Sequence, residues 1–89
     1  MKAAGEEQIE VEVSFYSFFK DLAGCAGCSE VMPVGSKLAD LIGLLSRRFP
    51  KLEPMRRSML LAVGVEYQDG SYLLKDGDEV SLFPPVQGG

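Results

Sequence analysis

The chain has 89 residues, 46% of them hydrophobic, and a formal net charge of −4, a composition typical of one soluble globular domain. Its nine basic residues are scattered along the sequence, so we expect no nucleic-acid partner. We also expect no membrane partner, because the longest purely apolar run, MLLAV at residues 59–63, is far shorter than the roughly 20 residues of a membrane-spanning helix. The start, MKAAGEEQ, lacks the apolar region of a signal peptide, which favours a cytoplasmic location.

The first elements predicted along the chain are a strand and a short helix. Residues 8–16 (QIEVEVSFY) alternate apolar and polar side chains, and this period of two is typical of a strand with one buried face. Residues 17–24 predict a short helix that ends at Gly24. The side chains expected along one side of this helix are Phe18, Leu22 and Phe19.

A second strand and a long helix follow. Residues 29–34 (SEVMPV) predict an edge strand, because Pro33 cannot donate a ladder hydrogen bond. Residues 35–50 predict an amphipathic helix with Ser36 as its N-terminal cap. Gly43, in the middle of this helix, indicates close packing on a sheet. The apolar stripe of the helix consists of Leu38, Leu41, Ile42, Leu45 and Phe49.

The second half of the chain predicts two further strands. Residues 59–68 (MLLAVGVEYQ) are more continuously apolar than the first strand, which predicts a central strand buried on both faces. Asp69-Gly70 is typical of a hairpin turn, residues 71–74 predict a short strand or bridge, and residues 76–78 predict another turn. Residues 79–83 (EVSLF) predict the last strand, with Val80 and Leu82 on one face and Ser81 and Phe83 on the other.

These elements predict an α+β fold, because one amphipathic helix must bury its stripe against one mixed sheet. A strand pair followed by a helix and more strands indicates a β-grasp (ubiquitin-like) roll, with the first and last strands side by side at its centre. We expect residues 1–8 to form a flexible leader, residues 9–83 the β-grasp domain, and residues 84–89 an extended Gly-Gly tail.

Two cysteines, Cys25 and Cys28, have the C-x-x-C spacing, but the chain has no histidine and no other cysteine. A zinc site needs four ligands, so we expect no metal site. A thioredoxin-like pair lies at the start of a helix that follows a strand, whereas this pair follows a predicted helix and precedes a strand. We therefore expect a loop with two thiols, and a redox or metal-binding role for Cys25 and Cys28 is the alternative.

Nothing in the sequence predicts an enzyme acting alone. The chain lacks histidine, the usual general base. Its carboxylates lie mostly on the exposed face of the first strand, in the leader and in turns, and no pair of them is placed for acid–base catalysis.

The sequence ends in FPPVQGG. Pro84 and Pro85 have a fixed φ and no N–H, so they cannot extend the last strand's ladder, and they favour a stiff, extended exit from the sheet. The residues beyond them are Val86, Gln87, Gly88 and Gly89. The valine offers one apolar contact, the glutamine is neutral and polar, and the two glycines let the backbone pass where a Cβ would clash. Such a tail can present the carboxylate of Gly89 clear of the domain.

The segment KDGDEVSLFPPVQGG, with FYSFFKDLAG, VGSKLADLIGLLSRRFP and LLAVGVEYQ, resembles the MoaD/ThiS family of ubiquitin-like sulfur carriers, and within it the MoaD branch, the small subunit of molybdopterin synthase. The resemblance implies that an adenylyltransferase related to ubiquitin-activating enzymes uses ATP to adenylate Gly89. It further implies that a sulfur donor converts the adenylate to a thiocarboxylate, and that residues 84–88 thread this terminus into the large subunit of molybdopterin synthase for dithiolene synthesis. It implies no cofactor bound by the chain itself.

The resemblance also implies a partner-binding face that includes Phe83 and Tyr67, with packing of both rings in a second small core as the alternative. Gly64 stands where the family often has Asn, and the CAGC segment is no family feature. Two other functions stay open. One is conjugation of Gly89 to lysines of target proteins, as in ubiquitin, and the other is sulfur supply to a different pathway, such as thiamine or tungsten cofactor synthesis.

Overall fold

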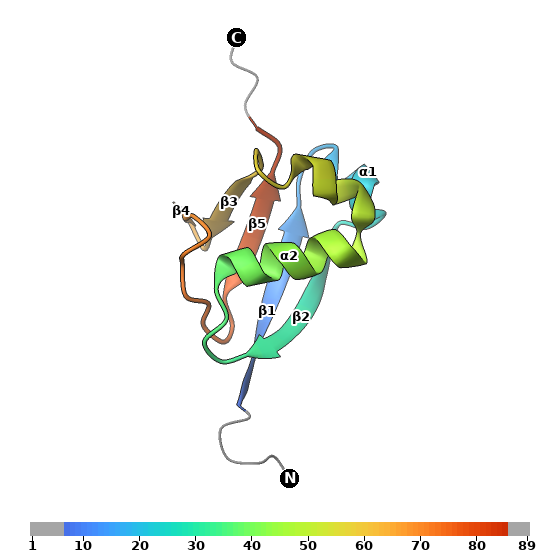
Figure 1. Ribbon diagram of the computed structural model, residues 1–89. Helices are drawn as coiled ribbons and strands as arrows, with labels where there is room; N and C mark the ends of the chain where they lie inside the picture. The colour runs from blue at the N-terminus through green and yellow to red at the C-terminus, as the bar shows by residue number, and fades with distance from the viewer. Residues whose placement is uncertain (1–6, 86–89) are drawn as a thin grey trace.

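The computed structural model describes residues 7–85 (Figure 1). In this part of the chain, five strands form one mixed sheet in the order β2-β1-β5-β3-β4. The strands are β1 Gln8–Phe15, β2 Gly27–Pro33, β3 Leu60–Val63, β4 Glu66–Tyr67 and β5 Glu79–Phe83. The helices are α1 Phe19–Ala23, α2 Leu38–Arg48 and the 3-10 helix η1 Pro50–Met55. Among these residues, no helix has the length and apolar character needed to cross a membrane.

The first and last strands, β1 and β5, lie side by side at the centre and run parallel, with Phe15 opposite Leu82. The other neighbouring pairs, β1–β2, β3–β5 and β3–β4, are antiparallel. The predicted α+β, β-grasp arrangement is therefore confirmed. Because β5 runs parallel to β1, it ends at Phe83, at the opposite end of the sheet from Gln8, where β1 begins (Figure 1).

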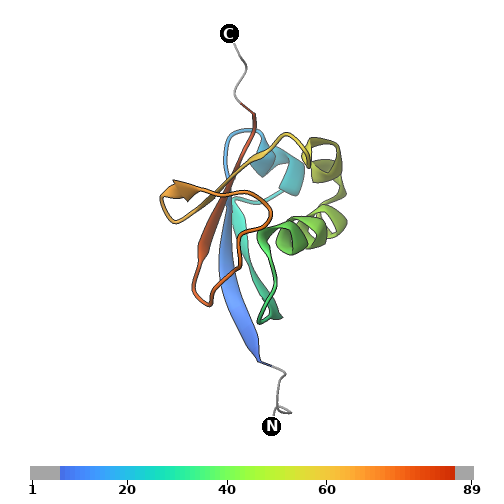
Figure 2. The ribbon, with the colours of Figure 1, turned by 60° about the vertical axis from the view of Figure 1, so that its left-hand side comes forward.

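The core lies between the sheet and α2, which crosses one face of it (Figures 1 and 2). The alternation predicted for β1 and the stripe predicted for α2 meet there. Each large side chain buried in this way contributes about 1.5–3 kcal/mol. The core residues from these elements and from β5 include Val11, Val13, Phe15, Leu38, Leu41, Leu45, Val80 and Leu82. Figure 2 shows α2 and η1 on one side of the sheet, and within residues 7–85 no helix covers the other side, here called the open face.

The short helix α1 differs from its prediction in which phenylalanine it buries. The chain turns at Ser17, which has a positive φ of 58°, and α1 then begins at Phe19. Phe19 is fully buried and Phe18 is 45% exposed, so the prediction that Phe18 lines the buried side was wrong. Leu22 packs against the core, and Gly24 ends the helix with a φ of 79°, both as predicted.

The N-terminus of α2 is stabilised by a different residue from the one predicted. Lys37 is the N-cap, and its backbone N–H donates to Oδ2 of Asp40 at 2.8 Å. The hydroxyl of Ser36 donates instead to the carbonyl of Pro33 at 2.8 Å. The prediction that Ser36 caps the helix was therefore wrong, because the preceding turn uses its hydroxyl.

After α2, the polar segment expected to be irregular contains η1, and Leu52 in it is fully buried. Arg56, which follows η1, is the closest neighbour of Gly43 in α2. A Cβ at Gly43 would lie 3.1 Å from Nη2 of Arg56 and within 4 Å of no sheet atom among its three nearest neighbours. Gly43 is thus closely packed, as predicted, but against an arginine and not against the sheet.

Residues 59–68 form a hairpin, not the single strand predicted. The chain turns at Gly64 and Val65, and Gly64 has a φ of 62°, a left-handed conformation that suits Gly or Asn. β3 then pairs with β4, with Ala62 opposite Tyr67. The prediction of burial on both faces was also wrong, because three of the four residues of β3 are partly exposed.

The segment that leads to β5 contains no hairpin turn at residues 69–70. Asp69 instead accepts a hydrogen bond from the N–H of Ser71 at 2.8 Å, which forms a local turn. The predicted bridge is present, between Leu73 and Lys37. The predicted turn at residues 76–78 is also present, and Gly77 in it has a φ of 87°.

Candidate functional site

Three aromatic rings gather on the open face at the end of β5, and they are called the aromatic patch here: Tyr16, Tyr67 and Phe83. The rings of Tyr16 and Phe83 are stacked, with centroids 4.6 Å apart and an interplanar angle of 12°. The ring of Tyr67 meets Phe83 edge-on, at 6.5 Å and 69°. Phe83 is therefore the centre of the aromatic patch.

The period-two geometry of the strands places these rings together. In β5, Val80 and Leu82 face the core, so Phe83 faces the other way. Tyr67 lies in β4 opposite Ala62 of β3, which in turn lies opposite Ser81 of β5. The small side chains of Ala62 and Ser81 leave a concavity beside the rings, lined by Tyr16, Ala62, Gly64, Val65, Tyr67, Ser81 and Phe83.

Tyr16 was not predicted as a site residue. It follows the last residue of β1, and its N–H donates to the carbonyl of Leu82 at 3.1 Å, which holds it next to the end of β5. The signal was present in the sequence, because the alternation of β1 continues through Ser14 to residue 16 and places it on the open face.

The aromatic patch is a surface cluster and not a second core. Tyr67 is 72% exposed and Tyr16 is 42% exposed, while Phe83 is partly buried between them. Val65, at the tip of the β3–β4 hairpin, is 99% exposed beside the same concavity. Exposed aromatic rings in one patch are typical of a protein-binding surface.

The predicted tail begins directly beside the aromatic patch. β5 ends at Phe83, and Pro84 and Pro85 follow it without regular structure, as expected for residues that cannot continue the ladder. The remaining predicted tail residues lie outside the described part of the chain: Val86, Gln87, Gly88 and Gly89. Their threading role and the chemistry assigned to Gly89 stay predictions.

Cys25 precedes β2 and Cys28 is its second residue, where β2 pairs with the end of β1. Cys28 lies within β2 and not in the predicted loop, and its thiol donates to Oε2 of Glu30 at 3.6 Å. Arg48 of α2 forms an ion pair with the same carboxylate. Burial, and then the Glu30 carboxylate, raise the pKa of the Cys28 thiol to about 11. Cys28 is therefore a protonated thiol at neutral pH and a poor nucleophile.

The glycine between the cysteines has a structural role. A Cβ at Gly27 would lie 2.4 Å from the carbonyl oxygen of Val13, so only glycine fits where β2 begins to pair with β1. No group of three or more His, Cys, Asp or Glu side chains is arranged to hold a metal ion within residues 7–85. The packing at Gly27 and the raised pKa of Cys28 thus indicate that these residues of the CAGC segment serve the fold.

Comparisons with known proteins agree with one another. The model of the ThiS family matches residues 13–89. The molybdopterin synthase sulfur carrier subunit of Arabidopsis thaliana is 31% identical over 81 residues, which cover 91% of this chain and 84% of that protein. A solved structure from Pyrococcus furiosus, described as a molybdopterin converting factor subunit 1, has a TM-score of 0.80 and 30% identity, covering 88% of this chain and 99% of that one.

A further solved structure, from Helicobacter pylori, is a complex of subunits 1 and 2 of the molybdopterin-converting factor. A chain of this complex has a TM-score of 0.66 and 27% identity, and the match covers 91% of this chain and all of that one.

Proposed function

The chain belongs to the ThiS family, and we propose that it is a sulfur carrier protein that donates sulfur for the dithiolene of molybdopterin. The position of the tail carries this proposal. The central strand β5 ends beside an exposed aromatic patch, and the proline pair leads directly from it toward the predicted terminal glycines. A rigid domain with a recognition surface at the base of a thin tail suits a carrier that presents its terminus to other proteins.

The chemistry that we propose takes place at the carboxylate of Gly89. A carboxylate is a poor electrophile, and attack of its oxygen on ATP, with release of pyrophosphate, gives an acyl-adenylate with a good leaving group. A persulfide sulfur then displaces AMP, and a thiol reduces the resulting acyl disulfide to leave a thiocarboxylate. The activating enzyme binds the ATP and the chain binds no cofactor. Because adenylation consumes ATP, the proposal includes a cytoplasmic location.

In this proposal the chain supplies the reacting terminus and its partners supply the catalysis. The large subunit of molybdopterin synthase binds the aromatic patch, with Phe83 as its central anchor, and receives the tail from Pro84 to Gly89. The complex of subunits 1 and 2 from Helicobacter pylori supports a large-subunit partner. The adenylyltransferase and the persulfide donor are partners of the same tail at the earlier steps.

Intact-protein mass spectrometry tests the proposal. After incubation with the activating enzyme, ATP and a persulfide donor, we expect one oxygen of the chain to be replaced by sulfur, at Gly89. The control is a variant lengthened by one residue after Gly89, which should keep the same circular dichroism spectrum and show no exchange. Sulfur exchange in the untrimmed lengthened variant would contradict the proposal. Covalent adducts to other proteins that disappear on deletion of Gly88 and Gly89 would favour conjugation instead.

A further inference from the structure

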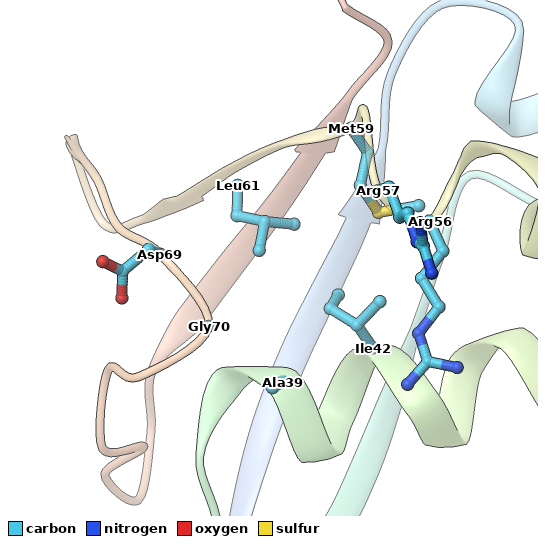
Figure 3. Close-up of a pocket in the computed structure, with 8 residues that line it drawn as sticks. All are labelled: Ala39, Ile42, Arg56, Arg57, Met59, Leu61, Asp69 and Gly70. Atoms are coloured by element: carbon cyan, nitrogen blue, oxygen red, sulfur yellow. The ribbon is translucent and has the colours of Figure 1, made fainter.

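A groove runs between α2 and β3 on the helix-covered side of the sheet, and it is called the α2–β3 groove here (Figure 3). Its apolar walls come from Ala39 and Ile42 of α2 and from Met59 and Leu61 beside and within β3. Leu61 lies opposite Leu82, a core residue. The groove therefore lies on the other side of the sheet from the aromatic patch, and the proposed sulfur transfer does not use it.

Two arginines, Arg56 and Arg57, border the α2–β3 groove, and in Figure 3 the side chain of Arg56 reaches toward α2 while Arg57 lies beside Met59. Because Gly43 has no side chain, the guanidinium group of Arg56 can lie close to α2. A Cβ at Gly43 would lie 3.1 Å from Nη2 of Arg56 and 3.9 Å from Nη1 of Arg47, so guanidinium groups converge on this point of α2. Glu53 is the anionic neighbour of Arg56, with Oε1 at 3.6 Å from Nη1, and both side chains are about half exposed.

This positive charge is only partly neutralised. Within residues 7–85 the ion pairs are Arg48–Glu30 and Arg56–Glu53, which leaves Arg47 and Arg57 without an ion-pair partner in that part of the chain. The chain as a whole carries a net charge of −4. Cationic side chains that converge on an otherwise acidic protein form a local site for an anionic group.

The other end of the α2–β3 groove is closed by the backbone of Gly70. A Cβ at Gly70 would lie 3.0 Å from Cβ of Ala39, and the N–H of Ala39 donates to the carbonyl of Gly70 at 3.0 Å. The carboxylate of Asp69 points away from the groove in Figure 3 and accepts a hydrogen bond from Ser71. The charges that the lining residues present to the groove are therefore those of the two arginines.

We propose that the α2–β3 groove is a docking site for an acidic peptide segment of a protein partner. An apolar side chain of that segment lies between α2 and β3, and a neighbouring carboxylate pairs with Arg56 and Arg57. Guanidinium groups bind carboxylates in a planar, bidentate geometry, which fixes the direction of the segment. A free inorganic anion would use the arginines alone and leave the apolar walls in water.

The test uses the full ¹⁵N-labelled chain and a defined probe, the peptide acetyl-Gly-Asp-Glu-Ile-Leu-Asp-Glu-Gly-amide. We expect saturable chemical-shift changes at the amides of Ala39, Ile42, Leu61 and Gly70 that weaken as salt is added. Two matched peptides separate the contributions. One has Asn and Gln in place of Asp and Glu, and the other has Ser-Ser in place of Ile-Leu. Both are expected to bind more weakly than the probe.

Substitutions in the chain locate the carboxylate contact. Replacing Arg56 and Arg57 by Gln is expected to weaken the probe roughly threefold to tenfold, because each exposed ion pair contributes modestly. Arg57→Gln alone, at an exposed position that does not contact Gly43, keeps the test valid if the double variant is unstable. Lys20→Gln on α1 removes the same charge away from the groove and should leave the probe affinity unchanged.

The proposal is overturned if the probe causes no saturable shifts, if the shifts map to the aromatic patch, or if Lys20→Gln weakens binding as much as Arg57→Gln. It is also overturned if inorganic phosphate alone gives the same shifts with equal affinity, because the site would then bind free anions. None of these measurements depends on thiocarboxylate formation, so failure of the sulfur-carrier proposal would leave this test unaffected.

Discussion

The two faces of the sheet differ in what covers them, and β5 contributes to both. On the helix-covered face, Val80 and Leu82 are 1% and 0% exposed, and α2 and the core surround them. On the open face, Ser81 and Phe83 of the same strand are partly exposed. Within residues 7–85 the long helix is α2, and one helix can cover only one face of a sheet.

The open face is itself divided. Along β1 it carries Glu10 and Glu12, which are exposed and suit contact with water. Only at the end of the strands, where the tail begins, does it become aromatic, with Tyr16, Tyr67 and Phe83. Exposed aromatic rings gathered at one end of this face indicate a surface for binding and not for folding. Substitutions on the two faces should therefore separate stability from recognition.

The largest effect on stability is expected from Leu82→Ala. Removing this fully buried side chain should lower the free energy of unfolding by about 2–5 kcal/mol, since it deletes apolar contacts and leaves a cavity. Urea unfolding followed by circular dichroism measures the change. Tyr67→Ala on the open face is the control, and it should change stability by no more than about 0.5 kcal/mol. A loss below about 1 kcal/mol for Leu82→Ala would show that the core does not depend on α2 as described.

Phe83→Ala should weaken binding more than it lowers stability. Its effect on stability should be smaller than that of Leu82→Ala, because Phe83 is only partly buried. Its affinity for the large subunit should fall by about 2 kcal/mol, roughly thirtyfold, as is typical of an aromatic anchor at the centre of an interface. Isothermal titration calorimetry measures this loss, and Val31→Ala, at a position 55% exposed on the edge strand β2 and outside the aromatic patch, is the matched control. Equal affinities for both variants would remove Phe83 from the interface.

The sequence predicted the elements whose side chains repeat with a clear period. The alternation in β1 and β5 and the stripe of α2 gave their bounds to within a few residues, because one buried face imposes one repeat. The β3–β4 hairpin was not predicted, because Gly64 and Val65 continue an apolar run in the sequence. The chain turns there through the positive φ of Gly64, which the apolar pattern does not indicate. Periodicity reports which face is buried and does not report where the backbone turns.

Only part of the candidate site could be predicted from the sequence. Phe83 and Tyr67 were expected together, and they meet through three neighbouring strands, β5, β3 and β4. Tyr16 was missed because it was treated as the end of a strand and not as a continuation of its open face. The α2–β3 groove could not be predicted, since Gly43 and Arg56 are distant in sequence and only the packing of η1 brings them together.

The smallest effect on the helix-covered face is expected from Cys28, through the pH dependence of the free energy of unfolding. This thiol packs against the core from the edge strand β2, and burial followed by the Glu30 carboxylate raises its pKa from 9.0 to about 11. Above pH 9 the unfolded chain loses the proton of Cys28 while the folded chain keeps it. The folded state then binds more protons, so stability due to this group is complete below about pH 9 and is lost progressively as the pH rises toward about 11.

The matched control for this prediction is Cys28→Ser, whose hydroxyl can still donate to Glu30 but does not titrate in this range. All other titratable groups are the same in both proteins, so their contributions cancel in the difference. Urea unfolding from neutral pH to about pH 11 should show a steeper loss of stability for the unsubstituted chain than for Cys28→Ser. Parallel curves would mean that water reaches Cys28 freely, and that the helix-covered face is less closed at its β2 edge than its packing indicates.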